Sequence, residues 1–456
     1  MGGSPVVGYK VRARAIVVAL VCAVTVAGRA GAETLPVVLA KAYQQNPQLN
    51  AQRALVRQTE EQVQQALAGY YPRVSATASA GPQYSDNRLR GVDAHRRDRL
   101  TGGNVGVTAS QTLFDGFRTP NQVEAAKGNV YAAREMLRLL AQQVLLDAAS
   151  AYMNVIRDGA ILELQKHNVE MLQEQLNFTR QRLKVREVTT TDVLQTQTRL
   201  AGARWALHAA NAALTTSRSA FRRVVGEEVS DLLVPASPVD RLSPATLDQA
   251  LALALKLNPS VKAAEVGIDV AAVQVKIAEG ALYPTAKLDV AAQYGQGLNA
   301  QFDRQFVAGA FVTLSVPIYQ GGAEYATIRE SQEALGQKRF DLDRVRDTVR
   351  AGVHDSWGQL AAARAQIEAA QAQVSAAQDA LKGVLQEASA GQRTTIDVLN
   401  AQQELISARV TLVATQRDRV VTSYAVLAAV GRLGPEALRL PARAAEPRQD
   451  PDARAK

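Results

Sequence analysis

The sequence is poor in the residues that build disulfide frameworks, metal centres and catalytic sites. Cys22 is the only cysteine among 456 residues, which excludes a disulfide scaffold and a thiolate metal site. The four histidines, His95, His167, His208 and His354, lie far apart without ligand spacing. Neither a phosphate-binding loop nor a nucleophile motif is present. We therefore expect no enzymatic activity, no cofactor and no metal.

Long apolar runs are also scarce. The one candidate lies at residues 15–27, where three basic residues precede it and small residues follow at 30–32. This order predicts a secretory signal peptide over residues 1–32. No later window approaches the roughly 20 apolar residues that a helical span requires, so we expect no transmembrane helix in the exported chain.

Aromatic residues and excess charge are both limited. Only 5% of residues are aromatic although 47% are hydrophobic, so the core must consist largely of Ala, Val and Leu, which favours long, closely packed helices. The net charge of +9 is small for a chain of this length. An exported chain with so mild an excess gives no reason to expect a nucleic-acid partner.

An internal repeat organises the sequence. Asn46-Pro47 recurs 212 positions later as Asn258-Pro259, and Asp192 recurs 205 positions later as Asp397. Repeats of this length indicate a duplicated structural unit. We therefore predict a tandem duplication, with a first repeat over residues 33–240, a second over 241–441 and a disordered tail over 442–456.

Each half is predicted to contain two strands and a pair of long helices. Alternation of apolar and polar residues predicts strands at about 73–83 and 104–114, then at about 285–295 and 306–318. Long helices are predicted over about 120–226 and 323–430. In the second of these stretches, Leu360, Ile367 and Val374 recur every seven residues with Ala363 and Ala370 between them, which is typical of a coiled coil.

The order of these features in both halves resembles the TolC family of outer-membrane channel-tunnels. The residues that carry the resemblance include "LFDGFRT", Leu113–Thr119, and the two "DVL" turns, and the similarity covers roughly residues 33–441. It implies a mixed α and β fold and a homotrimer, in which four strands per chain complete one twelve-stranded transmembrane β-barrel. The long coiled-coil helices would continue as an α-barrel from the outer membrane into the periplasm of a Gram-negative bacterium.

The resemblance also implies a function in transport. The protein would be an exit duct for type I protein secretion, efflux or both, and "LFDGFRT" favours the secretion branch. Its implied partners are an inner-membrane ABC or proton-driven transporter, a periplasmic adaptor (membrane fusion) protein and outer-membrane lipid. Two alternatives remain open: a small-molecule or metal efflux component of a proton-driven pump, and a soluble periplasmic coiled-coil scaffold whose strands lie outside lipid.

The stretch "VTTTDVLQTQ", Val188–Gln197, recurs in the second half as "RTTIDVLNAQ", Arg393–Gln402. Both copies begin the return helix after a long descending helix. One interpretation is helix capping, because Thr189 and Thr394 each precede an aspartate by three residues, as in a capping box.

The resemblance implies a second role for these turns, as a periplasmic gate. Arg393 would contact Thr191 and Asp192 of the first turn, and three copies of Asp397 would form a ring around the pore. Like charges brought together in this way attract cations. Asn400 stands where the family has a second acidic position, and Ala388 where it has a tyrosine, so we expect a weaker cation site and a looser latch.

Overall fold

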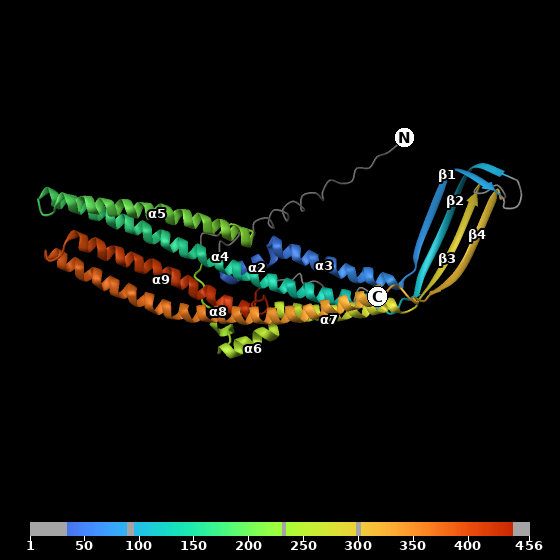
Figure 1. The fold of residues 1–456 in the computed structure, drawn as a ribbon. Coiled ribbons are helices and arrows are strands. Elements are labelled where there is room, and N and C mark those ends of the chain that lie inside the picture. The colour runs from blue at the N-terminus through green and yellow to red at the C-terminus, as the bar shows by residue number, and fades with distance from the viewer. Residues whose placement is uncertain (1–33, 89–94, 230–233, 298–301, 441–456) are drawn as a thin grey trace, which may run out of the picture.

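The computed structural model describes residues 34–88, 95–229, 234–297 and 302–440. The expected signal peptide and C-terminal tail lie outside these ranges. Figure 1 shows an elongated molecule with a sheet at one end and two long helical hairpins that reach side by side to the other end. The hairpins are α4 with α5 and α8 with α9.

The two repeats contain the same elements in the same order. The first consists of α2 (Leu35–Gln45), α3 (Pro47–Leu67), β1 (Arg73–Arg88), β2 (His95–Phe114), α4 (Arg118–Lys184) and α5 (Thr190–Val225). The second consists of α6 (Leu247–Leu257), α7 (Pro259–Glu279), β3 (Thr285–Gln296), β4 (Arg304–Ser315), α8 (Ala323–Ser389) and α9 (Thr395–Ala429). Short 3-10 turns, η1 (Ala68–Tyr70) and η3 (Gly280–Leu282), precede β1 and β3, and η2 (Asp240–Leu242) lies between the repeats.

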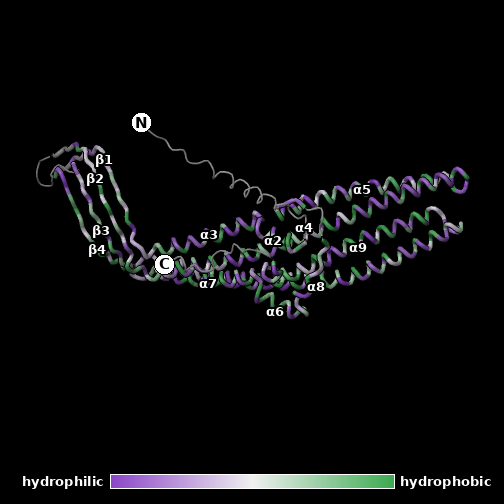
Figure 2. Tube along the Cα trace, turned by 180° about the vertical axis from the view of Figure 1, so that it is seen from behind, coloured by the Kyte–Doolittle hydropathy of each residue, from purple (hydrophilic) through white to green (hydrophobic). Residues whose placement is uncertain are grey.

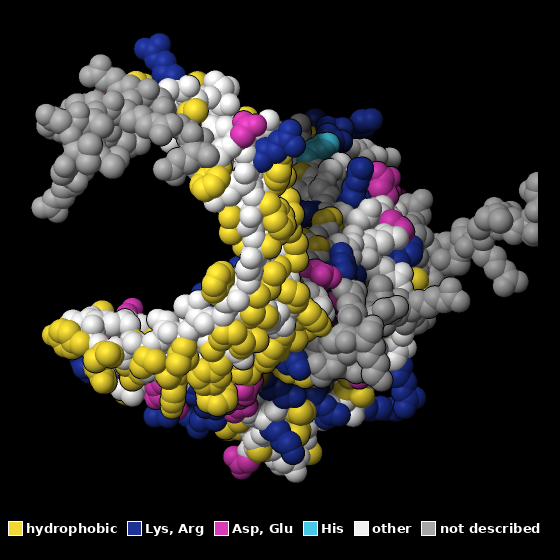
Figure 3. All heavy atoms as spheres, turned by 90° about the vertical axis from the view of Figure 1, so that its right-hand side faces the viewer, with side chains coloured by type: hydrophobic (Ala, Val, Ile, Leu, Met, Phe, Trp, Pro, Cys, Tyr) yellow, Lys and Arg dark blue, Asp and Glu magenta, His cyan; other side chains and the backbone are white. Residues whose placement is uncertain are grey.

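The four strands form one antiparallel sheet in the order β1-β2-β3-β4. Seen from the sheet end, the strands form an open arc along which hydrophobic side chains gather, and most charged side chains lie over the helices (Figure 3). Cross-strand pairing places Val74, Ala109, Val290 and Ala310 in one row. One face of the sheet is therefore an apolar band that stays exposed in a single chain.

Three strands differ in extent from the expected ranges, and one of them, β2, begins at His95 and not at about residue 104. β1 continues to Arg88 and pairs with β2 as far as His95, because backbone pairing continues beyond the point where apolar alternation ends. β4 ends at Ser315 and not at residue 318. Pro317 has no backbone N–H to donate to a neighbouring strand, which accounts for the earlier end.

The Asn-Pro pair of each repeat joins three helices. Asn46 accepts hydrogen bonds from the backbone N–H of Gln48 and Leu49, which caps α3, and its Nδ2 donates to the carbonyl of Val224 near the end of α5. Asn258 caps α7 and donates to the carbonyl of Ala429 at the end of α9. Both asparagines are buried. The repeated motif therefore fixes the end of each return helix.

The largest hydrophobic core lies where α2, α4, α5 and α9 meet, and we call it the equatorial core. Tyr152 of α4 is fully buried there, and its hydroxyl donates to the carbonyl of Val234 at 2.6 Å. Its other fully buried large side chains are Val38, Leu39, Leu145, Phe221, Leu427 and Leu433. The equatorial core anchors all the long helices except α8, which packs on α9, α7 and α6.

Beyond the equatorial core, α8 and α9 pack through a seam of small residues. Ala363, Ala370, Ala377 and Ala408 are buried, and Leu405 packs with the last two. The predicted coiled-coil seam is confirmed. Hydrophobic and hydrophilic residues interleave along both hairpins (Figure 2). Among the described ranges, no helix combines the length and the apolarity needed to cross a bilayer.

Candidate functional site at the helical tips

The α4–α5 and α8–α9 turns lie at the end of the molecule farthest from the sheet (Figure 1). They contain the repeated Thr-Asp stretch, so the candidate gate residues are at the tips of the two hairpins. Both return helices, α5 and α9, begin within this stretch.

Each tip contains a complete capping box. In the first, Asp192 Oδ2 accepts from the Thr189 N–H at 2.8 Å and from its hydroxyl at 2.7 Å, and the Asp192 N–H donates back to that hydroxyl. Asp397 and Thr394 repeat the pattern at 3.0 and 2.7 Å. Hydrogen bonds from the hydroxyl and then the backbone N–H of Thr394 lower the pKa of Asp397. The capping interpretation is therefore confirmed for both tips.

An ion pair closes each turn, and the two pairs have opposite polarity. At the first tip Arg182 at the end of α4 binds Glu187 at 2.9 Å. At the second, Glu387 at the end of α8 binds Arg393 at 2.8 Å. The hydrogen bond to Glu387, followed by the charges of Glu387 and Asp397, raises the pKa of Arg393. Arg393 thus contributes to closing its own turn, and half of its side chain stays exposed.

Contact between the two tips comes from neighbouring residues. Arg199 of α5 donates to Asn400 Oδ1 of α9 at 2.9 Å, across 201 residues of sequence. Beside this bond, Leu399 is 2% exposed and packs among Leu172, Leu176 and Leu200 of the first hairpin. We call this group the tip contact. It joins the start of α9 to the first hairpin by one polar bond and one apolar side chain.

A hollow of about 840 Å³ lies beside the tip contact. Thr191, Gln195 and Arg199 line it from the first hairpin, and Ile396 and Gln403 line it from the second. Thr191 is exposed. The structure therefore places Thr191 at the junction between the hairpins, together with residues from the α9 side.

The expected gate residues are only partly brought together within one chain. Among the described residues, the side-chain hydrogen bonds of Arg393 stay within its own turn, and those of Asp192 do the same. Asn400 has a partner, Arg199, that sequence reasoning missed. The sequence contained a signal for this contact. Arg199 corresponds to Glu404 in the second repeat, so the charge is reversed between two equivalent positions.

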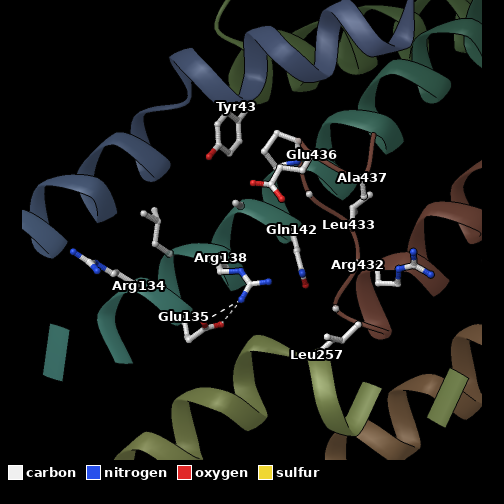
Figure 4. Close-up of a pocket in the computed structure, with 15 residues that line it drawn as sticks. Tyr43, Arg134, Glu135, Arg138, Gln142, Leu257, Arg432, Leu433, Glu436 and Ala437 are labelled. Carbon is white, nitrogen blue, oxygen red and sulfur yellow. Dashed lines mark hydrogen bonds and ion pairs between the residues drawn. The ribbon is translucent and has the colours of Figure 1, made fainter. Parts of the chain in front are cut away.

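A second hollow, of about 510 Å³, lies between α4, α2 and the segment that follows α9. Figure 4 shows Tyr43, Gln142 and Leu433 around it. Two arginines of α4 line this hollow, but Arg134 binds Glu60 at 2.9 Å and Arg138 binds Glu135 at 3.0 Å. Because these cations are already paired, the hollow gives no sign of a particular ligand class.

Duplicated hairpins of about 100 Å, estimated at ~1.5 Å per residue, together with an exposed apolar strand band, define a channel-forming class of protein. The chain matches the outer membrane efflux protein family over residues 38–227 and 250–432. It is 40% identical to the outer membrane efflux protein BepC of Brucella suis, over 90% of this chain and 87% of that protein. It is also 25% identical to the outer membrane protein TolC of Vibrio cholerae, over 90% and 93% of the two chains.

The fold is also found in a solved structure. The CmeC outer membrane channel of Campylobacter jejuni superposes with a TM-score of 0.76 at 14% identity, over 92% of this chain and 88% of that chain. The chain belongs to the outer membrane efflux protein family, the TolC family that its sequence resembles. It is an efflux or secretion channel of the Gram-negative outer membrane that extends into the periplasm and works with inner-membrane transporters and adaptors. It is not an enzyme.

Proposed function

We propose that three copies of this chain assemble into one exit duct, with twelve strands in the outer membrane and the helical hairpins in the periplasm. The observation that carries this proposal is the open sheet: in the described chain, β1 pairs only with β2 and β4 only with β3, so each has one unpaired edge. Unpaired strand edges are unfavourable in lipid, and four strands are too few to close a barrel. In this proposal residues 33–240 and 241–441 are the two repeats of each subunit.

The assembly is tested by the mass of the purified protein in mild detergent. We expect light scattering, corrected for bound detergent, to give three times the mass of one chain. Removal of detergent should cause aggregation, because the apolar band would face water. A monodisperse monomer that stays dissolved without detergent would overturn the proposal.

We further propose that the tips form the periplasmic gate, with Arg393, Thr191, Asp192, Asp397 and Asn400 among its residues. Two observations support this role. The hairpins touch at the tip through the small contact of Arg199, Leu399 and Asn400, and half of the Arg393 side chain is exposed. In a trimer, opening would require the second hairpin to move away from the first, which breaks this tip contact.

The gate is tested by conductance in planar bilayers. Removing the amide of Asn400 by Asn400→Ala breaks its bond with Arg199, so we expect a higher resting conductance, and the same for Arg199→Ala. Arg393→Ser should act in the same direction if Arg393 also contacts Thr191 or Asp192 across the assembly. Thr198→Ala, an exposed change one position from Arg199, is the control. Wild-type conductance in all three variants would refute the gate.

Asp397 has a separate proposed role as the acidic ring of the entrance. Asp397→Asn removes the charge with little change in shape, so we expect weaker block by divalent or trivalent cations. Asp192→Asn makes the same change in the other capping box and should leave the cation block unchanged. Equal losses of block in the two variants would show that the effect arises from damage to the caps and not from a ring.

The cargo is proposed from the comparisons and from the fold. Similarity to a protein named for efflux favours small-molecule efflux. The motif "LFDGFRT", which favours type I secretion, has a structural explanation here: Asp115 accepts from the backbone N–H of Thr119 at 2.7 Å, and Gly116 and Phe117 adopt positive φ values of 70° and 64°. Because these residues build the turn from β2 to α4, the motif is weak evidence about cargo.

A deletion strain distinguishes the two cargo classes. If efflux is the main task, we expect the strain to become sensitive to dyes and detergents and the cloned gene to restore resistance. Loss of specific proteins from the culture medium without a change in sensitivity would support type I secretion. The transporter gene beside this one, either an ABC exporter or a proton-driven pump, gives an independent indication of the inner-membrane partner.

A further inference from the structure

The two faces of the sheet differ in side-chain chemistry. One face is the apolar band, which faces outward when a barrel lies in lipid. The opposite face carries mostly small and polar side chains: Ser75 pairs with Thr108, and Ser110 lies between Arg73 and Asp289. Figure 3 shows hydrophobic side chains mainly along the convex side of the arc. The polar face therefore lies on the concave side, which in the proposed trimer is the wall of the duct.

Phe311 of β4 departs from the pattern of the polar face. Strand pairing places it opposite Asp289, in the row that begins with Arg73, and 68% of Phe311 is exposed. Among the strand residues that the structure describes, it is the only aromatic residue on this face. A single exposed ring is common on protein surfaces, so its surroundings decide whether it can bind a ligand.

The Phe311 ring lies over a glycine and beside a carboxylate. A Cβ added to Gly309 would lie 2.7 Å from Cε2 of Phe311, so the ring occupies the space that the glycine leaves on the wall. Side chains that lie directly opposite each other on paired strands have Cβ atoms about 4.5–5.5 Å apart, and Asp289 is exposed. One ligand can therefore contact both the ring and the carboxylate.

The row of Phe311 lies near the end of the sheet that joins the helices. Arg73 is the first residue of β1, and β4 ends at Ser315, shortly after Phe311. In the proposed trimer, three copies of the row would surround the duct at this level. Cargo that leaves the helical part of the duct would meet these rings as it enters the strands.

We propose that Phe311 and Asp289 form a contact site for lipophilic cations on the wall of the duct. The apolar body of such a cation would lie on the ring, whose face attracts positive charge, and the charged group would lie near the carboxylate. Arg73 and Lys287 lie on the same face and are exposed, so they offset the charge of Asp289. Charge alone therefore gives little attraction, and the site should favour lipophilic cations over small ones. This proposal rests on the proposed duct and adds a substrate class to it.

Thiol labelling tests which way the ring faces. Cys22, the only native cysteine, lies in the expected signal peptide, so Phe311→Cys and Ala310→Cys each add a single thiol to the exported chain. Ala310 is the adjacent residue on the apolar face. With the protein in lipid nanodiscs, we expect a charged maleimide that does not enter lipid to label Phe311→Cys well and Ala310→Cys poorly. Stronger labelling of Ala310→Cys would place the ring in lipid and overturn the site.

Binding of ethidium, an aromatic cation, tests the ligand class. Fluorescence anisotropy with the trimer in nanodiscs measures the affinity. We expect Phe311→Ser to weaken binding about two- to five-fold, the effect of one exposed cation–π contact, and Asp289→Asn to act in the same direction. Phe311→Tyr keeps the ring and should bind like wild type. Phe306→Ser removes a ring that is 70% exposed on the apolar face of the same strand, so it controls for dye dissolved in lipid and should leave the affinity unchanged.

Competition distinguishes a lipophilic site from a purely ionic one. Tetraphenylphosphonium should displace ethidium from the wild-type protein, whereas tetramethylammonium, which has the same charge and a much smaller apolar body, should displace little. Equal displacement by the two cations would overturn the proposed ligand class. If Phe311→Ser does not assemble, Phe311→Leu keeps an apolar cover over Gly309 without the aromatic ring and should show the same direction of change.

The outcomes separate this site from the proposed duct. A protein with the mass of a trimer whose ethidium affinity is the same in wild type, Phe311→Ser and Phe311→Leu would overturn the site and leave the duct intact. A protein with the mass of a monomer, in which positions 310 and 311 are labelled equally, would overturn both.

Discussion

The equatorial core and the tips are built from the same helices but by different interactions. At the equator, side chains from α2, α4, α5 and α9 are fully buried, and burial raises the pKa of Tyr424 to about 12. Asp158 is buried there as well, with hydrogen bonds from Arg157 and Ser217. At the tips, capping boxes and exposed ion pairs hold each turn, and one leucine and one hydrogen bond join the two hairpins.

This difference shows where the molecule can move. Buried apolar contacts contribute several kcal/mol for each large side chain, whereas exposed ion pairs contribute about 0 to 1 kcal/mol. The hairpins are therefore fixed at the equator and held loosely at their ends, as a gate at the tips requires. Substitutions at the equator should therefore cost more stability than substitutions at the tips.

The largest effect is expected for Tyr152→Ala. The substitution leaves a cavity in the equatorial core and removes the hydrogen bond to the carbonyl of Val234, so we expect a loss of about 3–5 kcal/mol in the free energy of unfolding. Circular dichroism during denaturation in detergent measures the loss. Trp205→Ala, at a residue near the tips that is 75% exposed, should change stability by less than about 0.5 kcal/mol. Similar losses in the two variants would remove the contrast.

The next largest effect is expected at Asn46 and Asn258, which each cap one helix and donate a hydrogen bond to the end of another. Asn258→Ala removes both the cap of α7 and the bond to the end of α9, so we expect a loss of about 1–3 kcal/mol. Asn46→Ala should cost a similar amount in the first repeat. Asn258→Ser keeps a capping oxygen but loses the donor, and its stability should lie between those of wild type and Asn258→Ala. A serine variant as unstable as the alanine variant would show that the cap contributes little.

Leu399→Ala should lower the free energy of unfolding only slightly, but it should clearly loosen the start of α9. Leu399 is the buried apolar side chain of the tip contact, and its loss should let the start of α9 move away from α5. Backbone amides near the start of α9 should then exchange hydrogen faster, whereas those around Tyr152 should be unchanged. Leu194→Ala, at a residue of the other tip that is 57% exposed, is the matched control. Unchanged exchange near Leu399 would show that the hairpins are joined elsewhere.

Much of this fold could be predicted because the two halves of the sequence contain corresponding features. The Asn-Pro pair, the alternating strands and the Thr-Asp turn each recur in both halves, and the fold class and the family assignment were confirmed. The Thr-Asp caps were also predictable, since a capping box depends on residues only three positions apart. Caps of this kind can be predicted because the residues that form them are close together in the sequence.

The contacts of the tips could not be predicted in the same way. Arg393 has a carboxylate, Glu387, six residues away, and choosing between this partner and Asp192 requires the path of the backbone. The bond between Arg199 and Asn400 depends on how two hairpins lie side by side across 201 residues of sequence. No periodic pattern specifies that arrangement, and these long-range polar contacts are the ones on which the gate proposal depends.

The smallest expected effect is the response of the tips to acid. Hydrogen bonds from Thr394 lower the pKa of Asp397, so the folded state favours the carboxylate, and this stabilisation is present at neutral pH and is lost as pH falls below about 4. Asp397→Asn lacks the charge at every pH. We therefore expect faster amide exchange around Thr394 in this variant than in wild type at pH 7, after correction for intrinsic rates, and a difference that shrinks as pH falls below about 4. At the equator, Lys41 and Gln45 lower the pKa of Glu227 by hydrogen bonding, so Glu227→Gln should lose its difference from wild type over the same acidic range. Because Glu227 lies beside the equatorial core, its change should leave exchange at the tips unaltered. A difference around Thr394 that does not shrink as pH falls below about 4 would show that the shape of the carboxyl group, and not its charge, closes the turn.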